Sequence, residues 1–169
     1  MKRRIRVGVV GVGYLGRFHA LIYSRMPDVD LIGVNDTDAA RALAVADEAG
    51  TGVIATEDMV GAVDAVSIVV PTTRHLEVAG PFLERGVHTL LEKPIAQDLR
   101  DAAEIVRLAS AGGGILQIGH LERFNAGVMA LADRIERPMF IEAQRMGGFK
   151  DRATDVDVIS DLMIHDIDI

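Results

Sequence analysis

A lysine and a histidine with two nearby acids are the side chains in this sequence best suited to proton transfer. Lys93 lies between an acid and a proline, directly after an apolar run. Asp161 and His165 are four residues apart and Asp168 is three further on, so a helix would place all three on one face. A carboxylate that sets the tautomer of a histidine and supports its charged form makes a general base. We therefore expect Lys93, Asp161 and His165 to be catalytic.

Other interpretations of these side chains stay open. Lys93 could be an exposed lysine on a turn, and Asp161 with His165 could lie on the solvent face of an ordinary helix. A divalent metal could instead bind Asp157, Asp161, His165 and Asp168. We favour a site without a metal, since a dinucleotide would already supply the reactive cofactor.

A dinucleotide is expected because a glycine turn joins an apolar run to a helical pattern. Gly11, Gly13 and Gly16 have the dinucleotide-binding spacing, with Tyr14 and Leu15 between the last two. The first glycine permits a tight turn, the second lets backbone approach a pyrophosphate, and the third lets the helix pack on the strand. The unpaired N–H groups that begin the helix would then bind the phosphates.

The second apolar run ends in an acid placed for the ribose of NAD. Asp36 follows Gly16 by twenty residues, where its carboxylate would accept a hydrogen bond from the ribose 2′-OH. Its charge would also repel the 2′-phosphate of NADP, so we expect NAD to be preferred. Arg41 could weaken this preference if its side chain turned back toward the ribose.

The elements that must position these residues alternate between buried strands and amphipathic helices. Strands are expected over 5–10, 29–34, 64–70, 87–91 and 115–118. Helices are expected over 15–26, 38–49, 56–61, 75–85 and 99–111. Thr37 is the expected cap of the second helix, and Val106 is expected to face the sheet. This order predicts an α/β fold with a doubly wound parallel sheet, whose ligands bind beyond the carboxyl ends of the strands.

The pattern changes after residue 120. We expect a helix over 125–135, a half-exposed strand over 139–146, a polar loop over 147–155 and an apolar segment over 157–169. One strand and one helix cannot form a core of their own. The sequence thus predicts a dinucleotide-binding domain over 1–120 and, over 121–169, the incomplete start of an α+β sheet domain that ends as if cut.

Composition restricts the partners and the location. The net charge of −7 argues against nucleic acid, whose phosphates would be repelled. There are no cysteines, which excludes disulfides and cysteine-bound metals. We find no signal peptide and no apolar run long enough to span a bilayer. A cytoplasmic protein with no membrane partner is therefore expected.

Taken together, the motifs resemble the Gfo/Idh/MocA family of nicotinamide-dependent oxidoreductases. The matching residues are Gly11, Gly13, Gly16, His19, Pro71, Thr72, His75, Glu92, Lys93, Pro94, Gly119, His120, Arg123, Phe124, Asn125, Asp161, Leu162, His165 and Asp168. Members are roughly twice this length and continue into a large open sheet. This chain lacks most of that sheet, so most of the substrate pocket and the usual dimer interface should be absent. The resemblance still implies a homo-oligomer. Because the apolar faces of residues 139–169 would lack the family's sheet, we expect this segment either to self-associate or to be poorly ordered.

The resemblance also implies roles for the candidate residues. Lys93 would hydrogen-bond the reacting hydroxyl and help to move its proton. His165 would be the principal acid/base, and Asp161 would hold the substrate or the lysine. His19 would pack against the cofactor. The implied cofactor-binding residues are Gly11, Gly13, Tyr14, Leu15, Gly16, Asp36, Pro71, Thr72, His75, Glu92 and Lys93.

The implied reaction is hydride transfer between NAD and a hydroxyl carbon of a sugar or sugar nucleotide. Segments 152–157 and 161–166 resemble members that oxidise the 3-hydroxyl of a UDP-linked N-acetylhexosamine. Alternatives are a non-enzymatic module that reports NAD(H) to a partner, and a chain that binds the cofactor without turnover. The lysine, aspartate and histidine argue against a sensor, which needs only the glycine turn and Asp36.

Overall fold

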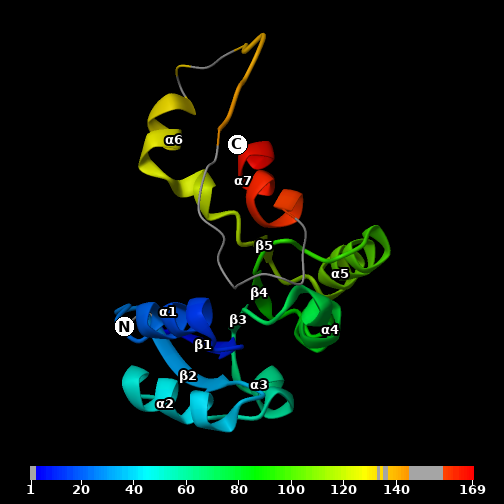
Figure 1. The fold of residues 1–169 in the computed structure, drawn as a ribbon. Helices are drawn as coiled ribbons and strands as arrows, with labels where there is room; N and C mark the ends of the chain where they lie inside the picture. Colours follow the sequence, from blue (N-terminus) through cyan, green and yellow to red (C-terminus); the bar gives the residue numbers. More distant parts are fainter. Residues whose placement is uncertain (1–2, 133, 135–136, 145–157) are drawn as a thin grey trace.

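A five-stranded parallel sheet forms the centre of the molecule, in the order β2-β1-β3-β4-β5 (Figure 1). The computed structural model describes residues 3–132, 134, 137–144 and 158–169, and only the backbone of residues 132, 160 and 161. The strands are β1 (Ile5–Val10), β2 (Val29–Asn35), β3 (Ala65–Ile68), β4 (His88–Leu91) and β5 (Leu116–Ile118). The predicted doubly wound parallel sheet is confirmed.

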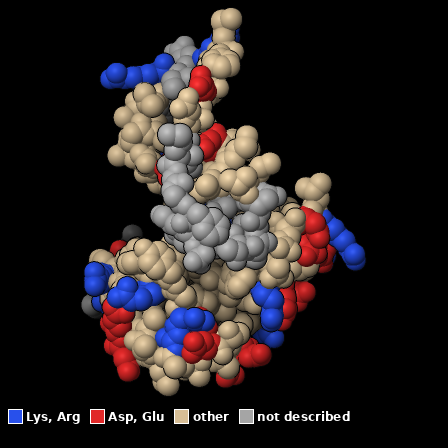
Figure 2. All heavy atoms as spheres, viewed as in Figure 1, with Lys and Arg blue, Asp and Glu red and all other residues tan. Residues whose placement is uncertain are grey.

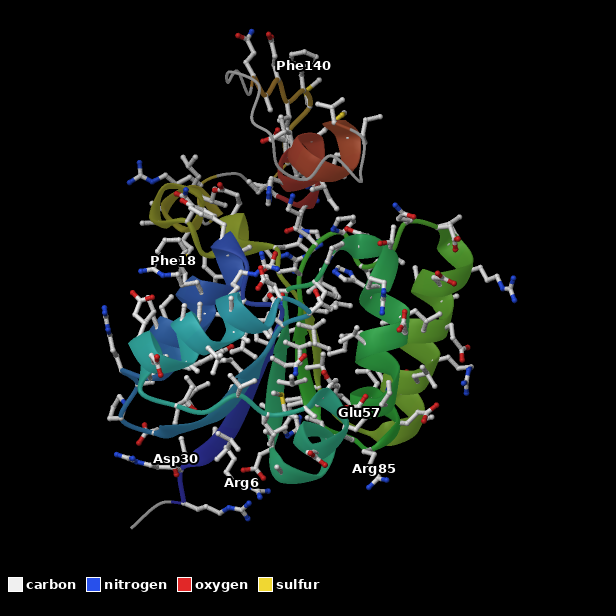
Figure 3. The ribbon with its side chains drawn as sticks, turned by 60° about the horizontal axis from the view of Figure 1, so that its bottom comes forward. Arg6, Phe18, Asp30, Glu57, Arg85 and Phe140 are labelled. Atoms are coloured by element: carbon white, nitrogen blue, oxygen red, sulfur yellow. The ribbon has the colours of Figure 1, made fainter. Side chains whose placement is uncertain are left out.

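Helices cover both faces of this sheet (Figure 3). They are α1 (Tyr14–Tyr23) and α2 (Ala39–Ala49) on one face, and α3 (Thr56–Ala62), α4 (His75–Glu84) and α5 (Leu99–Gly112) on the other. Val9 packs in the cluster under α1 and α2, whereas Val10 packs in the larger cluster under α3, α4 and α5. Successive strand residues point to opposite faces, so a strand buried on both sides is apolar throughout.

Two expected details are wrong. Asp38, not Thr37, caps α2, because its carboxylate accepts hydrogen bonds from two first-turn amides at 3.0 and 3.1 Å. In α5, Val106 is 51% exposed, whereas Ile105 and Leu108 are buried. Adjacent helical residues point in directions about 100° apart, so a helix that buries Ile105 turns its neighbour toward solvent.

The chain leaves the sheet after β5. It continues through the 3₁₀ turn η2 (Leu121–Phe124), α6 (Ala126–Ala132), the π-helical turn η3 (Ile159–Met163) and α7 (Ile164–Asp168). The strand expected over 139–146 is wrong in its described part, 139–144, where no residue pairs with a strand. Phe140 is 81% exposed and lies at the opposite end of the molecule from Arg6 and Asp30 (Figure 3). A strand needs a neighbour for its backbone groups, and the described residues supply none there. The loop expected over 147–155 lies outside the described residues.

The C-terminal segment has an exposed apolar surface. Its exposed side chains are Val158, Ile159, Leu162, Met163, Ile167 and Ile169. In Figure 2 the region of α7 is mostly uncharged, whereas acidic and basic side chains intermingle over the part that contains the five-stranded sheet. Among the described helices, none has the length and apolar character needed to cross a membrane.

Candidate nucleotide-binding and catalytic site

A cavity of about 1010 Å³ lies beyond the carboxyl ends of the strands. Most of the predicted site residues line it: Gly11, Gly13, Tyr14, Leu15, Asp36, Pro71, Thr72, Glu92, Lys93 and His165. In a parallel sheet all strands end at the same edge, so turns that are distant in the sequence converge there. One cavity is thus lined by the glycine turn, Asp36, Lys93 and His165.

The glycine turn has the geometry that a pyrophosphate requires. Gly11 has a φ of +84°, in the left-handed region that favours glycine, and its amide donates to the Asn35 carbonyl at 2.8 Å. A Cβ on Gly16 would lie 1.8 Å from the Gly11 carbonyl oxygen, so no side chain fits. A Cβ on Gly13 would meet nothing within 4 Å, which leaves room for a ligand against the backbone. The first turn of α1 carries no acidic residue that would repel a phosphate.

Two backbone amides and the side chain of Arg41 fix Asp36 at the end of β2. The amides of Val12 and Asp38 lie 2.8 and 2.9 Å from its carboxylate oxygens, and Arg41 adds Nη2 at 2.7 Å and Nε at 3.1 Å. Burial would raise the pKa of the Asp36 carboxyl, but these hydrogen bonds outweigh it and hold the pKa below its usual value. Asp36 is thus a charged acceptor that already shares its oxygens with Arg41.

The turn after β4 brings Lys93 to the cavity. The amide of Glu92 donates to the Ile68 carbonyl at 3.0 Å, which continues the pairing of β4 with β3 for one residue. The amide of Lys93 donates to Oε2 of Glu92 at 3.3 Å. The structure therefore places Lys93 in the cavity wall together with His165 of α7, although the two are far apart in the sequence. The side chain of Asp161 lies outside the described residues.

An ion pair that we did not expect attaches α7 to η2, the turn that follows the last strand of the sheet. Arg123 of η2 donates two hydrogen bonds of 2.7 Å each to the Asp168 carboxylate. These bonds lower the pKa of Asp168 below its usual value, because they outweigh burial, which raises it. The charges of His120 and His165 lower it further. His165 is on the helix that this pair holds. Arg123 belongs to a motif that we quoted, but nothing in the sequence identified Asp168 as its partner.

Three predicted residues lie behind the cavity wall. Gly16 packs under the glycine turn. His75 is 1% exposed, with Nδ1 3.2 Å from the Ile95 carbonyl and Nε2 3.1 Å from the Val70 carbonyl. The ring of His75 therefore faces two loops beside the cavity, not the space inside it. His19 is mostly buried, with its side chain 10% exposed and Nδ1 2.6 Å from the Ser67 hydroxyl.

Sequence reasoning missed several polar residues of the wall. They are Asn35, Thr56, Glu57, Glu77 and Glu122. Most come from helix starts, whose position relative to the strand ends depends on how the helices pack. No group of histidines and acids that could hold a metal occurs among the described residues, which omit Asp157 and the side chain of Asp161.

Residues 5–120 match the model of the GFO_IDH_MocA family, described as oxidoreductases with an NAD-binding Rossmann fold. The chain belongs to this family. Over 98% of its length it is 42% identical to a UDP-N-acetylglucosamine 3-dehydrogenase of Acidithiobacillus ferrooxidans, of which it covers 53%. It is 32% identical over its whole length to an inositol 2-dehydrogenase of Corynebacterium glutamicum, of which it covers 54%. This Gfo/Idh/MocA chain therefore spans about half the length of these curated relatives.

Solved structures agree with this assignment. The UDP-N-acetylglucosamine 3-dehydrogenase of A. ferrooxidans superimposes with a TM-score of 0.92 at 41% identity, over 99% of this chain and 56% of that one. A scyllo-inositol dehydrogenase of Lactobacillus casei with bound NAD(H) and scyllo-inositol gives 0.70 at 27% identity, over 79% and 42% of the chains. The predicted family is confirmed.

Proposed function

We propose that this Gfo/Idh/MocA chain is the cofactor-binding part of an NAD-dependent dehydrogenase that oxidises a secondary hydroxyl of a sugar nucleotide. The hydroxyl we favour is the 3-hydroxyl of a UDP-linked N-acetylhexosamine. One observation carries the proposal: a lysine and a histidine both line a cavity that also contains a dinucleotide-binding glycine turn. The similarity to a UDP-N-acetylglucosamine 3-dehydrogenase over nearly the whole chain supports the choice of substrate.

The described residues fit NAD. The glycine turn and the start of α1 would hold the pyrophosphate, and Asp36 would accept from the ribose 2′-OH. Pro71, Thr72 and Glu92 would surround the nicotinamide end, where bound NAD⁺ supplies the hydride acceptor.

The chain's own side chains would handle the proton. Lys93 would donate to the substrate oxygen and keep the hydroxyl oriented, and His165 would take the proton that the hydroxyl loses. Asp168 is close enough to His165 for their charges to interact, and its negative charge would favour the imidazolium that results. Asp161 would hold the substrate or the lysine.

We place the domain boundary near residue 120, where the sheet ends. The apolar residues left exposed on η3 and α7 would then pack against further protein, either a longer part of the same chain or a second copy. The oligomer that the sequence suggests would form through this surface.

The test is NADH formation by the purified protein, with any segment that its gene encodes beyond residue 169 included. UDP-N-acetylglucosamine, UDP-N-acetylgalactosamine, UDP-glucose and myo-inositol are supplied in parallel with NAD⁺. We expect turnover with a UDP-N-acetylhexosamine. Turnover with myo-inositol alone would overturn the substrate class, and NAD⁺ binding without turnover on any of these would favour the non-enzymatic module.

A further inference from the structure

A buried histidine and a buried glutamate face each other next to Lys93, and the proposed reaction uses neither of them for proton transfer. Nε2 of His19, on α1, lies 3.5 Å from Oε1 of Glu92, which follows β4. The two side chains are only 10% and 8% exposed. Gly119 closes the site from the end of β5, since a Cβ there would lie 2.8 Å from Oε1. An acid and a base are thus enclosed together between α1 and two strand ends.

The two oxygens of Glu92 are in different situations. Oε2 accepts from the Lys93 amide at 3.3 Å, whereas Oε1 is buried and accepts no hydrogen bond from the described residues. An ionised carboxylate with an unsatisfied buried oxygen is costly. At 3.5 Å the contact to His19 is just beyond hydrogen-bond length, so a small approach of either side chain would complete it.

The surroundings favour the uncharged form of both groups. Burial raises the pKa of Glu92, against a smaller lowering by the Lys93 amide and charge. Burial lowers the pKa of His19. The charged groups that face the Glu92 carboxyl from the described elements are Lys93 on the same turn and, when protonated, His19 on α1. Ser67 of β3 and Gly119 add no charge.

Ser67 allows the histidine to adapt to either state of the glutamate. Its hydroxyl lies 2.6 Å from Nδ1 of His19 and can donate or accept there. When Ser67 donates, Nε2–H points at an ionised Glu92. When Ser67 accepts, the Nε2 lone pair can accept a hydrogen bond from the O–H of a neutral Glu92 carboxyl. A neutral imidazole therefore suits both forms without leaving its position.

We propose that His19 and Glu92 form a buried dyad that holds one exchangeable proton in the free protein and releases it when NAD⁺ binds. The inference rests on the proposed function, which places the nicotinamide end beside Lys93 and Glu92. NAD⁺ carries a positive ring, and NADH does not. A cation beside the cavity-lining carboxyl stabilises its ionised form, so the O–H bond of Glu92 breaks and the proton passes to the solvent. The ring proton of His19 shifts from Nδ1 to Nε2 as Ser67 changes from acceptor to donor, so the imidazole stays neutral and donates Nε2–H to the carboxylate.

The dyad would make the protein distinguish the two redox forms of its cofactor by pH. Below the raised pKa of Glu92, NAD⁺ can bind only if a proton is released, and this requirement weakens NAD⁺ binding. As the pH rises through that pKa, the carboxylate is already ionised and NAD⁺ binds more tightly, while NADH gains nothing. The ratio of the NADH and NAD⁺ dissociation constants should therefore rise with pH.

Calorimetric titration of the chain with NAD⁺ and with NADH measures this directly. Each titration is repeated in two buffers of different ionisation enthalpy, across mildly acidic to neutral pH, and the difference in heat gives the protons released. We expect more protons to be released with NAD⁺ than with NADH. Glu92→Gln should abolish this difference, and the exposed control Glu84→Gln should keep it.

His19→Leu is the second variant, and it remains informative if Glu92→Gln does not fold. It removes the donor to the carboxylate, so the pH of maximal proton release should move upward. Equal proton release with NAD⁺ and NADH in the unmutated protein would overturn the dyad while leaving the proposed function intact. So would an unchanged difference in Glu92→Gln. Failure to bind either dinucleotide would overturn the proposed function as well.

Discussion

The guanidinium of Arg41 donates two hydrogen bonds to the carboxylate of Asp36, from Nη2 to Oδ1 at 2.7 Å and from Nε to Oδ2 at 3.1 Å. The side chain of Asp36 is 6% exposed and that of Arg41 is 46% exposed. Both line the cavity. The acid proposed to recognise the ribose is therefore mostly buried and shares its oxygens with a more exposed basic group, and the two side chains should have opposite effects on NADP(H).

Replacement of Asp36 by alanine should narrow the preference for NAD(H) over NADP(H) by about tenfold. A hydrogen bond to a charged acceptor contributes about 1.5–3 kcal/mol, and the repulsion of a 2′-phosphate is lost in the same change. Calorimetric dissociation constants for both cofactors measure the ratio. Asp36→Asn controls for the amide contact from Val12. Tighter binding of NADP(H) than of NAD(H) by the unmutated protein would contradict this role for Asp36.

Arg41→Gln should weaken NADP(H) binding by about 3- to 10-fold and change NAD(H) binding much less. The exposed guanidinium can pair with a 2′-phosphate, and its loss leaves the charge of Asp36 uncompensated. Arg85→Gln is the matched control, since Arg85 lies away from the cavity at the other end of the sheet (Figure 3). An equal loss of affinity for both cofactors would show that Arg41 only supports the fold of the site.

In the protein with any segment encoded beyond residue 169 included, Lys93→Ala should leave NAD⁺ binding nearly intact. It should lower turnover of the proposed sugar-nucleotide substrate by about 10²–10⁴-fold, the usual cost of losing a positioned proton-transfer group. Steady-state rates and calorimetry on the same preparations separate the two effects. Lys150→Ala is the control for the loss of one lysine, since Lys150 lies outside the described residues. A normal kcat in Lys93→Ala would show that Lys93 is an ordinary lysine on a turn and takes no part in proton transfer.

The Arg123–Asp168 pair should hold α7 against η2. Arg123→Ala leaves Asp168 without the two bonds that anchor it, so amide hydrogen exchange in α7 should quicken several-fold. Exchange in α5 should be unchanged. Arg107→Ala, which breaks a similar pair with Glu104 on α5, is the control. Equal exchange in α7 with and without Arg123 would show that the pair does not hold the helix.

Asp64 should make stability depend on acid pH. Arg6 donates to its carboxylate through two side-chain bonds and its own amide, and these contacts hold the pKa of Asp64 far below its usual value. A lowered pKa means that the contribution is complete above the unfolded value and is lost as the pH falls below about 3.9. Asp64→Asn should therefore lower Tm by a few degrees at neutral pH and by less in acid.

The control for this change is Asp30→Asn, which removes a single, more exposed pair with Arg4. Its Tm should change less at every pH. Thermal unfolding followed by circular dichroism across the acid range measures both variants. A constant loss in Asp64→Asn down to strongly acid pH would show that the carboxylate contributes through packing and not through its charge.

The sequence alone determined the parts of the molecule that depend on neighbours along the chain. A strand buried on both faces is apolar throughout, a turn with a φ of +84° favours glycine at position 11, and Asp36 follows directly where β2 ends. Each of these is a local requirement of backbone geometry. These local patterns predicted the order of strands and helices. That order in turn predicted the edge of the sheet where a ligand would bind.

Only the tertiary structure decided which side chains face one another. It turned His75 toward two backbone carbonyls, paired Arg123 with Asp168, and brought His19 of α1 against Glu92. These contacts depend on the rotation and position of each helix on the sheet. The rotation and position are determined by packing against side chains from elements that are distant in the sequence. A strand, likewise, forms only where another backbone offers hydrogen bonds, so alternation over 139–144 did not suffice to make one.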